Sequence, residues 1–390
     1  MKKKFTHEQT RVLNRQLVTK TIYDAGQISR AQVARVTRLT RPTISDMVAE
    51  LMAQGLVVEV GYAPSTGGKR PMLLRVDEDA RHMVSIDLSR KDFRGAVIDL
   101  RGEVRHREHR PLRGDRRSLD LVFELVDALV AAADRPLLGI GVGTPGLIDA
   151  VNGVIVAAVN QEWTDVPLRR LLEERYGVPA YVANDCQVAA LGEFTFGNVN
   201  GVQDLVVISV GWGIGAGIVL GGQLLHGNPF GAGEIGHTAV VEHGERCSCG
   251  NFGCLETVSG SQAIVRRVRE LVARRDGPPG RRSEDITFDV VCKMFHSGDE
   301  GVGEVVYAAG RGLGTAVAYL VGTLGGCPIR LAGQVAILGP GLLEVIREEM
   351  ARRTLPALAD RTHIDFATLG NDIVLRGASA LVLHHELGVL

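Results

Sequence analysis

The 390-residue sequence contains no apolar run as long as a membrane span, and no apolar stretch follows the lysines at its N-terminus. A helix needs about 20 consecutive apolar residues to cross a bilayer, and a secretory signal needs an apolar segment behind its basic start. The lack of a long apolar run argues against a membrane partner, and the lack of an apolar segment behind the N-terminal lysines argues against secretion. We therefore expect a cytoplasmic location.

Cysteine is also scarce, with six residues, three of which lie in one eight-residue window. Small secreted domains held by disulfides are richer in cysteine, so this usage fits a reducing compartment. The 45% hydrophobic and 23% charged content is ordinary for a soluble globular protein. The length predicts two or three domains.

The sequence has no overall excess of positive or negative charge, since its formal net charge is −1. The charged residues are nevertheless unevenly distributed along the chain. Residues 1–76 contain thirteen Lys and Arg against five Asp and Glu, whereas the remainder has 31 basic and 40 acidic residues. A basic segment on an acidic body is typical of a part that binds a polyanion. A solvated basic face without a partner is the alternative.

Two short helices joined by a tight turn are predicted in this basic segment. Ser29 is suited to cap a helix over 30–36, and Thr40 a second helix over 41–54 with Pro42 in its first turn. A preceding helix is indicated by apolar residues at helical spacing, namely Leu13, Leu17, Val18 and Ile22. This arrangement predicts a helix-turn-helix, whose second helix enters the major groove of DNA.

A β-hairpin that would form a wing follows these helices. Predicted strands over 56–60 and 72–76 flank a turn whose tip, Lys69 and Arg70, would reach phosphate or the minor groove. A helical dimerisation module is the alternative, but the helices, the wing and the charge all agree with DNA binding. The residues predicted to contact DNA are Ser29, Arg30, Arg41, Pro42, Thr43, Ser45, Lys69 and Arg70.

The body of the chain is predicted to be α/β with two lobes joined by a cleft. Strands are predicted over 83–88, 94–99, 138–142 and 180–183, with a further strand after Gly102 and a helix over 119–132. Three antiparallel strands followed by alternating strand and helix form the ribonuclease-H-like arrangement of sugar kinases and actin. A second lobe should open at the buried strand 204–210. The predicted domains are 1–78, 79–200 and 201–390.

Glycines alternate with other residues from Gly211 to Gly217, which we predict to be a loop before a strand over 218–220. Such glycines allow backbone amides to approach an anion such as phosphate. They also serve tight turns between strands, and the spacing leaves both interpretations open.

One histidine and three cysteines, His237, Cys247, Cys249 and Cys254, fall within eighteen residues. Three thiolates and one imidazole are the ligands of a closed tetrahedral zinc site, which leaves no open position for activating water. Four unrelated buried residues are the alternative, and a disulfide between Cys247 and Cys249 would close too tight a ring. We predict a structural Zn²⁺ that fixes the wall of a pocket.

Several oxygen acceptors are predicted to serve a neutral polyol, whose hydroxyls both donate and accept hydrogen bonds. Asn184 and Asp185 follow a strand, where open α/β sheets place ligands. Either residue could instead cap the next helix, and both roles can coexist. Glu234 and Glu256 flank the cysteine cluster and add further carboxylates.

Taken together, these motifs resemble those of the ROK family (repressors, open reading frames and kinases), and in particular its NagC/XylR-type transcriptional regulators. The resemblance covers nearly the whole chain. The segments that carry it are 231–237, 247–256, 139–146, 160–168 and 184–185, with 29–35 and 41–45 similar to the regulators' helix-turn-helix.

The resemblance implies an N-terminal winged helix-turn-helix followed by a two-lobed fold of the actin and sugar-kinase type. It also implies that His237 binds zinc through one ring nitrogen while the other faces the ligand. The residues that it implies for the sugar site are Asn160, Asn184, Asp185, Glu234, His237 and Glu256.

One turn departs from the pattern of the ROK kinases, which have Asp-Xaa-Gly-Gly-Thr where ATP phosphates bind. Here the turn reads Asp87-Leu88-Ser89-Arg90, so side chains stand where bare backbone is needed. Asp185, which matches the kinase base, is retained. We therefore predict sensing rather than phosphoryl transfer.

The leading hypothesis is a sugar-responsive repressor of carbohydrate genes, such as those of xylose or hexose metabolism. Its expected partners are a sugar effector, palindromic double-stranded operator DNA and further copies of itself in a homodimer or homotetramer. An ATP-dependent sugar kinase that uses Asp185 as its base and carries an added DNA-binding domain is the alternative. A regulator that has lost ligand control is a third possibility.

Overall fold

The computed structural model describes residues 6–63, 70–89, 92–112, 118–158, 161–199, 201–227, 231–274 and 283–389. Its contacts divide the chain into two compact units. Unit 1 comprises Met1–Val188 and Val374–Leu390, and unit 2 comprises Ala189–Ile373. The chain passes between them within helix α6 (Asp185–Phe196) and at the start of α13 (Ile373–Leu387). Unit 1 therefore includes the C-terminal helix, which the sequence-based division placed in the last domain.

The N-terminal part of unit 1, called the head here, has the predicted winged helix-turn-helix. Its elements are α1 (His7–Ala25), β1 (Ile28–Ser29), α2 (Arg30–Thr37), α3 (Arg41–Ala53), β2 (Val57–Tyr62) and β3 (Met72–Val76). The side chains of Ser29 and Thr40 cap α2 and α3 as predicted, and Arg38 turns the chain between these helices with a φ of 59°. The antiparallel strands β2 and β3 form the wing, to which β1 adds a short third strand.

The head is held together by a small apolar core contributed by every helix. Val18, Ile22, Val33, Ile44 and Leu51 are fully buried. The apolar pattern of α1 is only half used, however, because Leu13 and Leu17 remain 48% and 41% exposed. Helical spacing therefore predicted the helix correctly without identifying which residues it buries.

The first sheet of the body has the predicted ribonuclease-H-like order β11-β7-β4-β5-β6. Its strands are β4 (His82–Asp87), β5 (Asp92–Asp99), β6 (Val104–Pro111), β7 (Leu137–Thr144) and β11 (Ala180–Asn184). The first three are antiparallel, and β7 and β11 continue in parallel. A smaller sheet adds β8 (Leu147–Asp149), β9 (Val154–Ala158) and β10 (Trp163–Val166).

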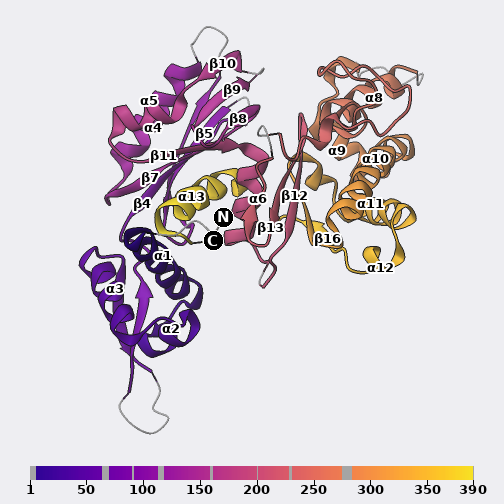
Figure 1. Ribbon diagram of the computed structural model, residues 1–390. Coiled ribbons are helices and arrows are strands. Elements are labelled where there is room, and N and C mark those ends of the chain that lie inside the picture. Colours follow the sequence, from indigo (N-terminus) through magenta and orange to yellow (C-terminus); the bar gives the residue numbers. More distant parts are fainter. Residues whose placement is uncertain are drawn as a thin grey trace. The chain divides into compact units, whose positions relative to one another are not determined.

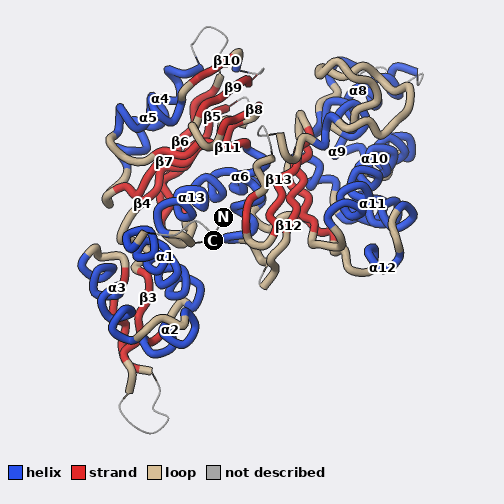
Figure 2. The backbone as a smooth tube through the Cα atoms, viewed as in Figure 1, coloured by secondary structure: helices blue, strands red, loops and turns tan. Residues whose placement is uncertain are grey.

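Helices cover this sheet, as the ribbon and tube views show (Figures 1 and 2). They include α4 (Ser118–Ala132), α5 (Leu168–Tyr176) and α13. Helix α13 lies so close to β7 that a Cβ atom on Gly141 would be 2.0 Å from the carbonyl oxygen of Ala378. Glycine is therefore required at this position by the packing of the C-terminal helix.

Unit 2 repeats the same strand order, β14-β13-β12-β15-β16, with antiparallel pairs on one side of β12 and parallel pairs on the other. Its strands are β12 (Leu205–Val210), β13 (Ile214–Leu220), β14 (Gln223–Leu224), β15 (Ile329–Ala332) and β16 (Ile364–Phe366). Its helices are α7 (Leu255–Ser259), α8 (Ser261–Arg274), α9 (Phe288–His296), α10 (Glu300–Leu324), α11 (Pro340–Arg353) and α12 (Pro356–Ala359).

Strand β13 begins earlier than predicted, at Ile214 rather than 218. Gly215 and Gly217 belong to the strand and pair with Ser209 and Val207. Another segment approaches this strand closely, since a Cβ atom on Gly233 would be 1.8 Å from the carbonyl oxygen of Ala216. Glycines here serve close backbone packing, which the sequence pattern could not distinguish from a loop.

By its length and composition, helix α10 could cross a membrane. No apolar run of that length was expected from the sequence. In unit 2 this helix packs against α7, α8, α9 and α11, and 61% of its most apolar window is buried. A buried core helix has the same composition, which accounts for its apolar character.

The head contacts the turn between β5 and β6 through Tyr23, near the end of α1. The Tyr23 hydroxyl donates to the carbonyl oxygen of Leu100 at 2.8 Å, and the Arg101 guanidinium lies 4.1 Å above the tyrosine ring. Arg101 also donates to the Tyr23 carbonyl oxygen at 3.0 Å. Burial raises the pKa of Tyr23 to about 12, so the hydroxyl keeps its proton and remains a donor.

Tyr23→Phe should therefore destabilise the chain, because the buried carbonyl of Leu100 loses this donor. We expect the free energy of unfolding to fall by about 1–3 kcal/mol, measured by urea denaturation of the full-length chain. Tyr62→Phe is the matched control, since Tyr62 is 63% exposed. Equal unfolding midpoints for both variants and the unmodified chain would contradict this role of Tyr23.

Candidate functional site

The predicted ligand set converges in unit 2. The ligand atoms of His237, Cys247, Cys249 and Cys254 all lie within 4.8 Å of one another. Cys247 Sγ is 3.6 Å from His237 Nδ1, and Cys249 Sγ is 3.7 Å from Cys254 Sγ. A tetrahedral ion bound to sulfur at about 2.3 Å and nitrogen at about 2.0 Å separates two sulfurs by about 3.8 Å and sulfur from nitrogen by about 3.6 Å. The four residues therefore fit a tetrahedral metal ion.

Backbone hydrogen bonds position these four side chains. Cys247 N donates to Asn251 O at 2.7 Å, which closes the loop that carries two of the thiols. Cys254 immediately precedes α7, and its neighbour Leu255 donates to Thr238 O at 2.9 Å, next to His237. Burial raises the pKa of Cys254 to about 12, so a bound cation would have to displace its proton.

Two carboxylates lie beside this cluster. Because His237 directs Nδ1 toward Cys247, its Nε2 is left 4.0 Å from Glu234 Oε2. The pKa of the Glu234 carboxyl is raised, because protein atoms pack around it and Glu256 lies nearby. The side chain nevertheless remains 47% accessible. Glu256 accepts a hydrogen bond from the Ile214 amide at 3.3 Å. Unit 2 thus combines an oriented imidazole with two acceptors.

The other predicted sugar ligands belong to unit 1. Asn184 ends β11 and Asp185 begins α6. The Asn184 side chain donates to Gly146 O at 3.1 Å and accepts from the Cys186 amide at 2.9 Å. Asn184 therefore caps α6, which was the alternative to ligand binding, while part of its surface remains accessible. Asn160 lies outside the described residues.

The turn after β4 differs chemically from a phosphate cradle. Asp87 is fully buried and forms an ion pair with Arg94, its register partner on β5. The Ser89 amide also donates to Asp87 at 2.9 Å. This carboxylate is therefore already neutralised within the protein. Sequence reasoning missed Arg94, although the β4–β5 hairpin register could have placed it opposite Asp87. Arg90 lies outside the described residues.

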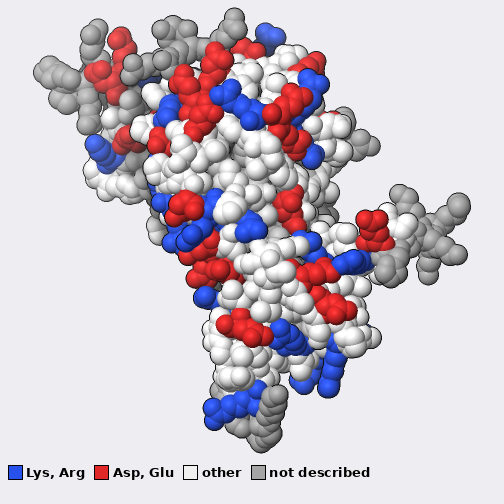
Figure 3. Space-filling view, turned by 90° about the vertical axis from the view of Figure 1, so that its left-hand side faces the viewer, with Lys and Arg blue, Asp and Glu red and all other residues white. Residues whose placement is uncertain are grey.

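The predicted DNA contacts have different environments in the head. Arg41, Pro42 and Ser45 are exposed at the start of α3, and Thr43 is half-buried. On the face shown in Figure 3, Lys and Arg side chains gather around the lower end of the head. Arg70 is exposed, whereas Lys69 lies outside the described residues.

Two residues of the predicted DNA-binding set already have partners within the head. Ser29 is buried and caps α2 through Gln32. Arg30 is bound to Glu59 of the wing at 2.8 Å. These interactions stabilise the head, so the two residues contribute to its shape whether or not they also reach DNA.

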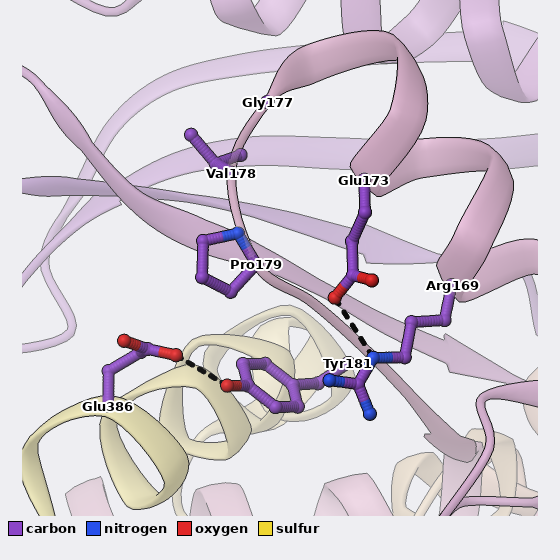
Figure 4. Close-up of a pocket in the computed structure, with 7 residues that line it drawn as sticks. All are labelled: Arg169, Glu173, Gly177, Val178, Pro179, Tyr181 and Glu386. Atoms are coloured by element: carbon purple, nitrogen blue, oxygen red, sulfur yellow. Dashed lines mark hydrogen bonds and ion pairs between the residues drawn. The ribbon is translucent and has the colours of Figure 1, made fainter.

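A separate concavity of about 460 Å³ lies on unit 1 (Figure 4). Tyr181 donates to Glu386 and stacks on His385 of α13, with ring centroids 4.2 Å apart. Arg169 binds Glu173 at 2.9 Å on α5. Because these polar groups satisfy one another, the contacts attach α13 to β11 and α5 rather than forming a ligand site. The lining residues are Arg169, Glu173, Gly177, Val178, Pro179, Tyr181 and Glu386.

Comparison with known proteins extends the likeness to the whole chain. The model of the ROK family matches residues 83–385. The xylose repressor of Caldicellulosiruptor bescii is 32% identical over 98% of both chains. The DNA-binding transcriptional dual regulator NagC of Escherichia coli is 32% identical over 95% of this chain and 92% of its own length.

Two solved structures differ in how much of this chain they match. A ROK family transcriptional regulator, a homologue of the E. coli MLC protein, aligns with a TM-score of 0.87 at 27% identity over 97% of this chain and 98% of its own. A ROK family glucokinase from Streptomyces griseus, solved with glucose and AMPPNP, aligns with a TM-score of 0.66 at 26% identity. The alignment covers 98% of the glucokinase but only 77% of this chain.

Cys249→Ser should reduce the metal content of the purified chain toward zero, because three remaining ligands hold an ion more weakly than a complete tetrahedron. Cys249 is exposed, so the substitution leaves the apolar core intact. Metal per chain is measured by mass spectrometry of the acid-digested protein, with Cys186→Ser as a control thiol outside the cluster. Full occupancy in Cys249→Ser would show that this residue is not a ligand.

Proposed function

This chain belongs to the ROK family, and we propose from that membership and from the winged helix-turn-helix of its head that it is a sugar-responsive transcriptional regulator. The observation that carries the proposal is the winged helix-turn-helix joined to a ROK body. A solved ROK regulator matches 97% of this chain, whereas a ROK glucokinase matches 77%. We propose that it represses carbohydrate genes and acts in the cytoplasm. Similar proteins named xylose repressor and, in Escherichia coli O157:H7, N-acetylglucosamine repressor support the role in repression.

Helix α3 is the proposed recognition helix. Its exposed N-terminal residues Arg41, Pro42 and Ser45 are available to base edges in the major groove, with Thr43 beside them. Arg70, and Lys69 at the wing tip, are proposed to contact the DNA backbone or minor groove. A homodimer or homotetramer would present two such helices to a palindromic operator about one DNA turn apart.

The proposed effector is a neutral sugar bound by Asn184, Asp185, Glu234, His237 and Glu256, with Asn160 as a further ligand. Carboxylates and amides suit hydroxyls that both donate and accept hydrogen bonds. For the sugar to release DNA, it must favour the non-binding state by a few kcal/mol.

Zinc is the proposed ion of the four-residue cluster. A set of three cysteines and one histidine is a common structural zinc site. When bound, Zn²⁺ would hold the two cysteine loops and fix the tautomer of His237, so that Nε2 stays turned toward Glu234. With four protein ligands it has no position left for water, which makes its role structural.

A sugar kinase is the second candidate, favoured by the likeness to a glucokinase and by the retained Asp185. The ion pair between the buried Asp87 and the half-buried Arg94 opposes it. This carboxylate is already compensated by a guanidinium, and removing that partner would leave a buried charge uncompensated. The ion pair thus supports sensing without phosphoryl transfer.

Arg41→Ala should weaken DNA binding by about 1–3 kcal/mol, since it removes a cation from the leading turn of α3. Binding is measured by fluorescence anisotropy at fixed salt on a duplex that the unmodified chain selects from a randomised pool. Arg352→Ala, which removes an exposed arginine of α11, should bind that duplex normally. Unchanged affinity of Arg41→Ala would contradict the placement of α3 in the groove.

The purified chain should release no sugar-dependent ADP when incubated with MgATP and D-glucose, D-xylose or N-acetyl-D-glucosamine. We expect this result because the Asp87 carboxylate already forms an ion pair with the Arg94 guanidinium. A coupled enzyme assay measures ADP, and a hexokinase added to the same mixture controls for inhibition. Sustained release that is abolished by Asp185→Asn would instead identify a kinase.

A further inference from the structure

The turn between β12 and β13 exposes a large aromatic side chain. Trp212 is 58% exposed, whereas Trp163, the other tryptophan of the chain, is 8% exposed and packs in the core of unit 1. Leaving an indole in water forgoes roughly 1.5–3 kcal/mol of burial. Such exposure is informative when the side chain stands beside groups suited to bind a ligand.

The turn that carries Trp212 is held by a hydrogen bond within itself and by contacts with the segment that contains Glu256. The Gly211 amide donates to Gly213 O at 2.9 Å, and the Ser261 amide donates to Gly211 O at 2.9 Å. A Cβ atom on Gly213 would be 2.9 Å from Glu256 Oε2. The turn is therefore fixed, and Trp212 immediately precedes the glycine that Glu256 approaches.

The same contacts argue against the phosphate interpretation of these glycines. Two amides that an anion would need are already used, Gly211 N by Gly213 and Ile214 N by the Glu256 carboxylate. A carboxylate at this turn also repels phosphate. Of these glycines, Gly213 allows the close approach of Glu256, which argues against a nucleotide phosphate at this turn.

An exposed aromatic residue in a turn that contacts the Glu256 carboxylate matches the two-sided chemistry of a sugar. Pyranose rings present C–H groups on one face and hydroxyls at their edges, and binding pockets combine aromatic walls with a few placed polar groups. We infer that Trp212 is the aromatic wall of the effector site and determines which sugar binds there. It contacts the C–H face while Glu256 accepts from a hydroxyl. This inference rests on the proposed sugar response.

The test uses the full-length chain with Trp163→Phe, which makes Trp212 the single tryptophan. D-xylose, D-glucose and N-acetyl-D-glucosamine are titrated, and binding is measured separately by calorimetry. For a sugar that binds, we expect the Trp212 emission to move to shorter wavelength and its quenching by acrylamide to fall. In the unmodified background, Trp212→Ala should raise the Kd at least tenfold, and Trp212→Phe less. Tyr319→Ala, at a tyrosine that is 52% exposed on α10, should leave the Kd unchanged.

The outcomes separate this inference from the function on which it rests. If the unmodified chain binds a sugar and Trp212→Ala binds it equally well, Trp212 is not part of the site although the sugar response stands. An emission change with MgATP and none with a bound sugar would assign the turn to a nucleotide and overturn the inference. If none of the three sugars binds the unmodified chain, both the sugar response as proposed and the role of Trp212 fail.

Discussion

The convergence of one imidazole and three thiols is the constraint on which the proposed site depends. His237 and the three cysteines come from loops that have little regular structure of their own, yet their ligand atoms lie within 4.8 Å. This arrangement orients His237 toward Glu234 and places Cys254 directly before the helix that carries Glu256. The proposed acceptors Glu234 and Glu256 are thus positioned by the loops and the short helix that surround this cluster.

Two internal interactions bear on the choice between a sensor and a kinase. Asp87 forms an ion pair with Arg94 across the β4–β5 hairpin, and Glu256 accepts from an amide of the β12–β13 turn. We propose that these interactions use groups that phosphoryl transfer would need, whereas the proposed sugar acceptors remain. On this proposal the body acts as a sensor.

Much of the fold could be predicted from the sequence, because local signals and the fold agree. The capping residues Ser29 and Thr40 marked the two helices of the head, and the strands of the first sheet were predicted. In the second sheet only β12 and the end of β13 were predicted. The spacing of the cysteines also predicted their convergence. Long-range pairing was harder to predict: Gly215 and Gly217 were assigned to a loop, whereas they pair with β12 as part of β13.

The limits of prediction at the site have the same physical origin. Arg94 was missed because its partner depends on strand register, and the packing of α13 on β7 of unit 1 depends on the small size of Gly141. Likewise, Trp212 is exposed because it lies in the β12–β13 turn, and its neighbours in the sequence did not predict that exposure.

On the proposed function, a sugar changes DNA affinity without any phosphoryl transfer. This is tested by measuring the affinity of the purified chain for its selected duplex, without nucleotide, as a function of sugar concentration. A sugar shown by calorimetry to bind should lower this affinity at least tenfold. Operator affinity that stays constant at saturation with that sugar would contradict it.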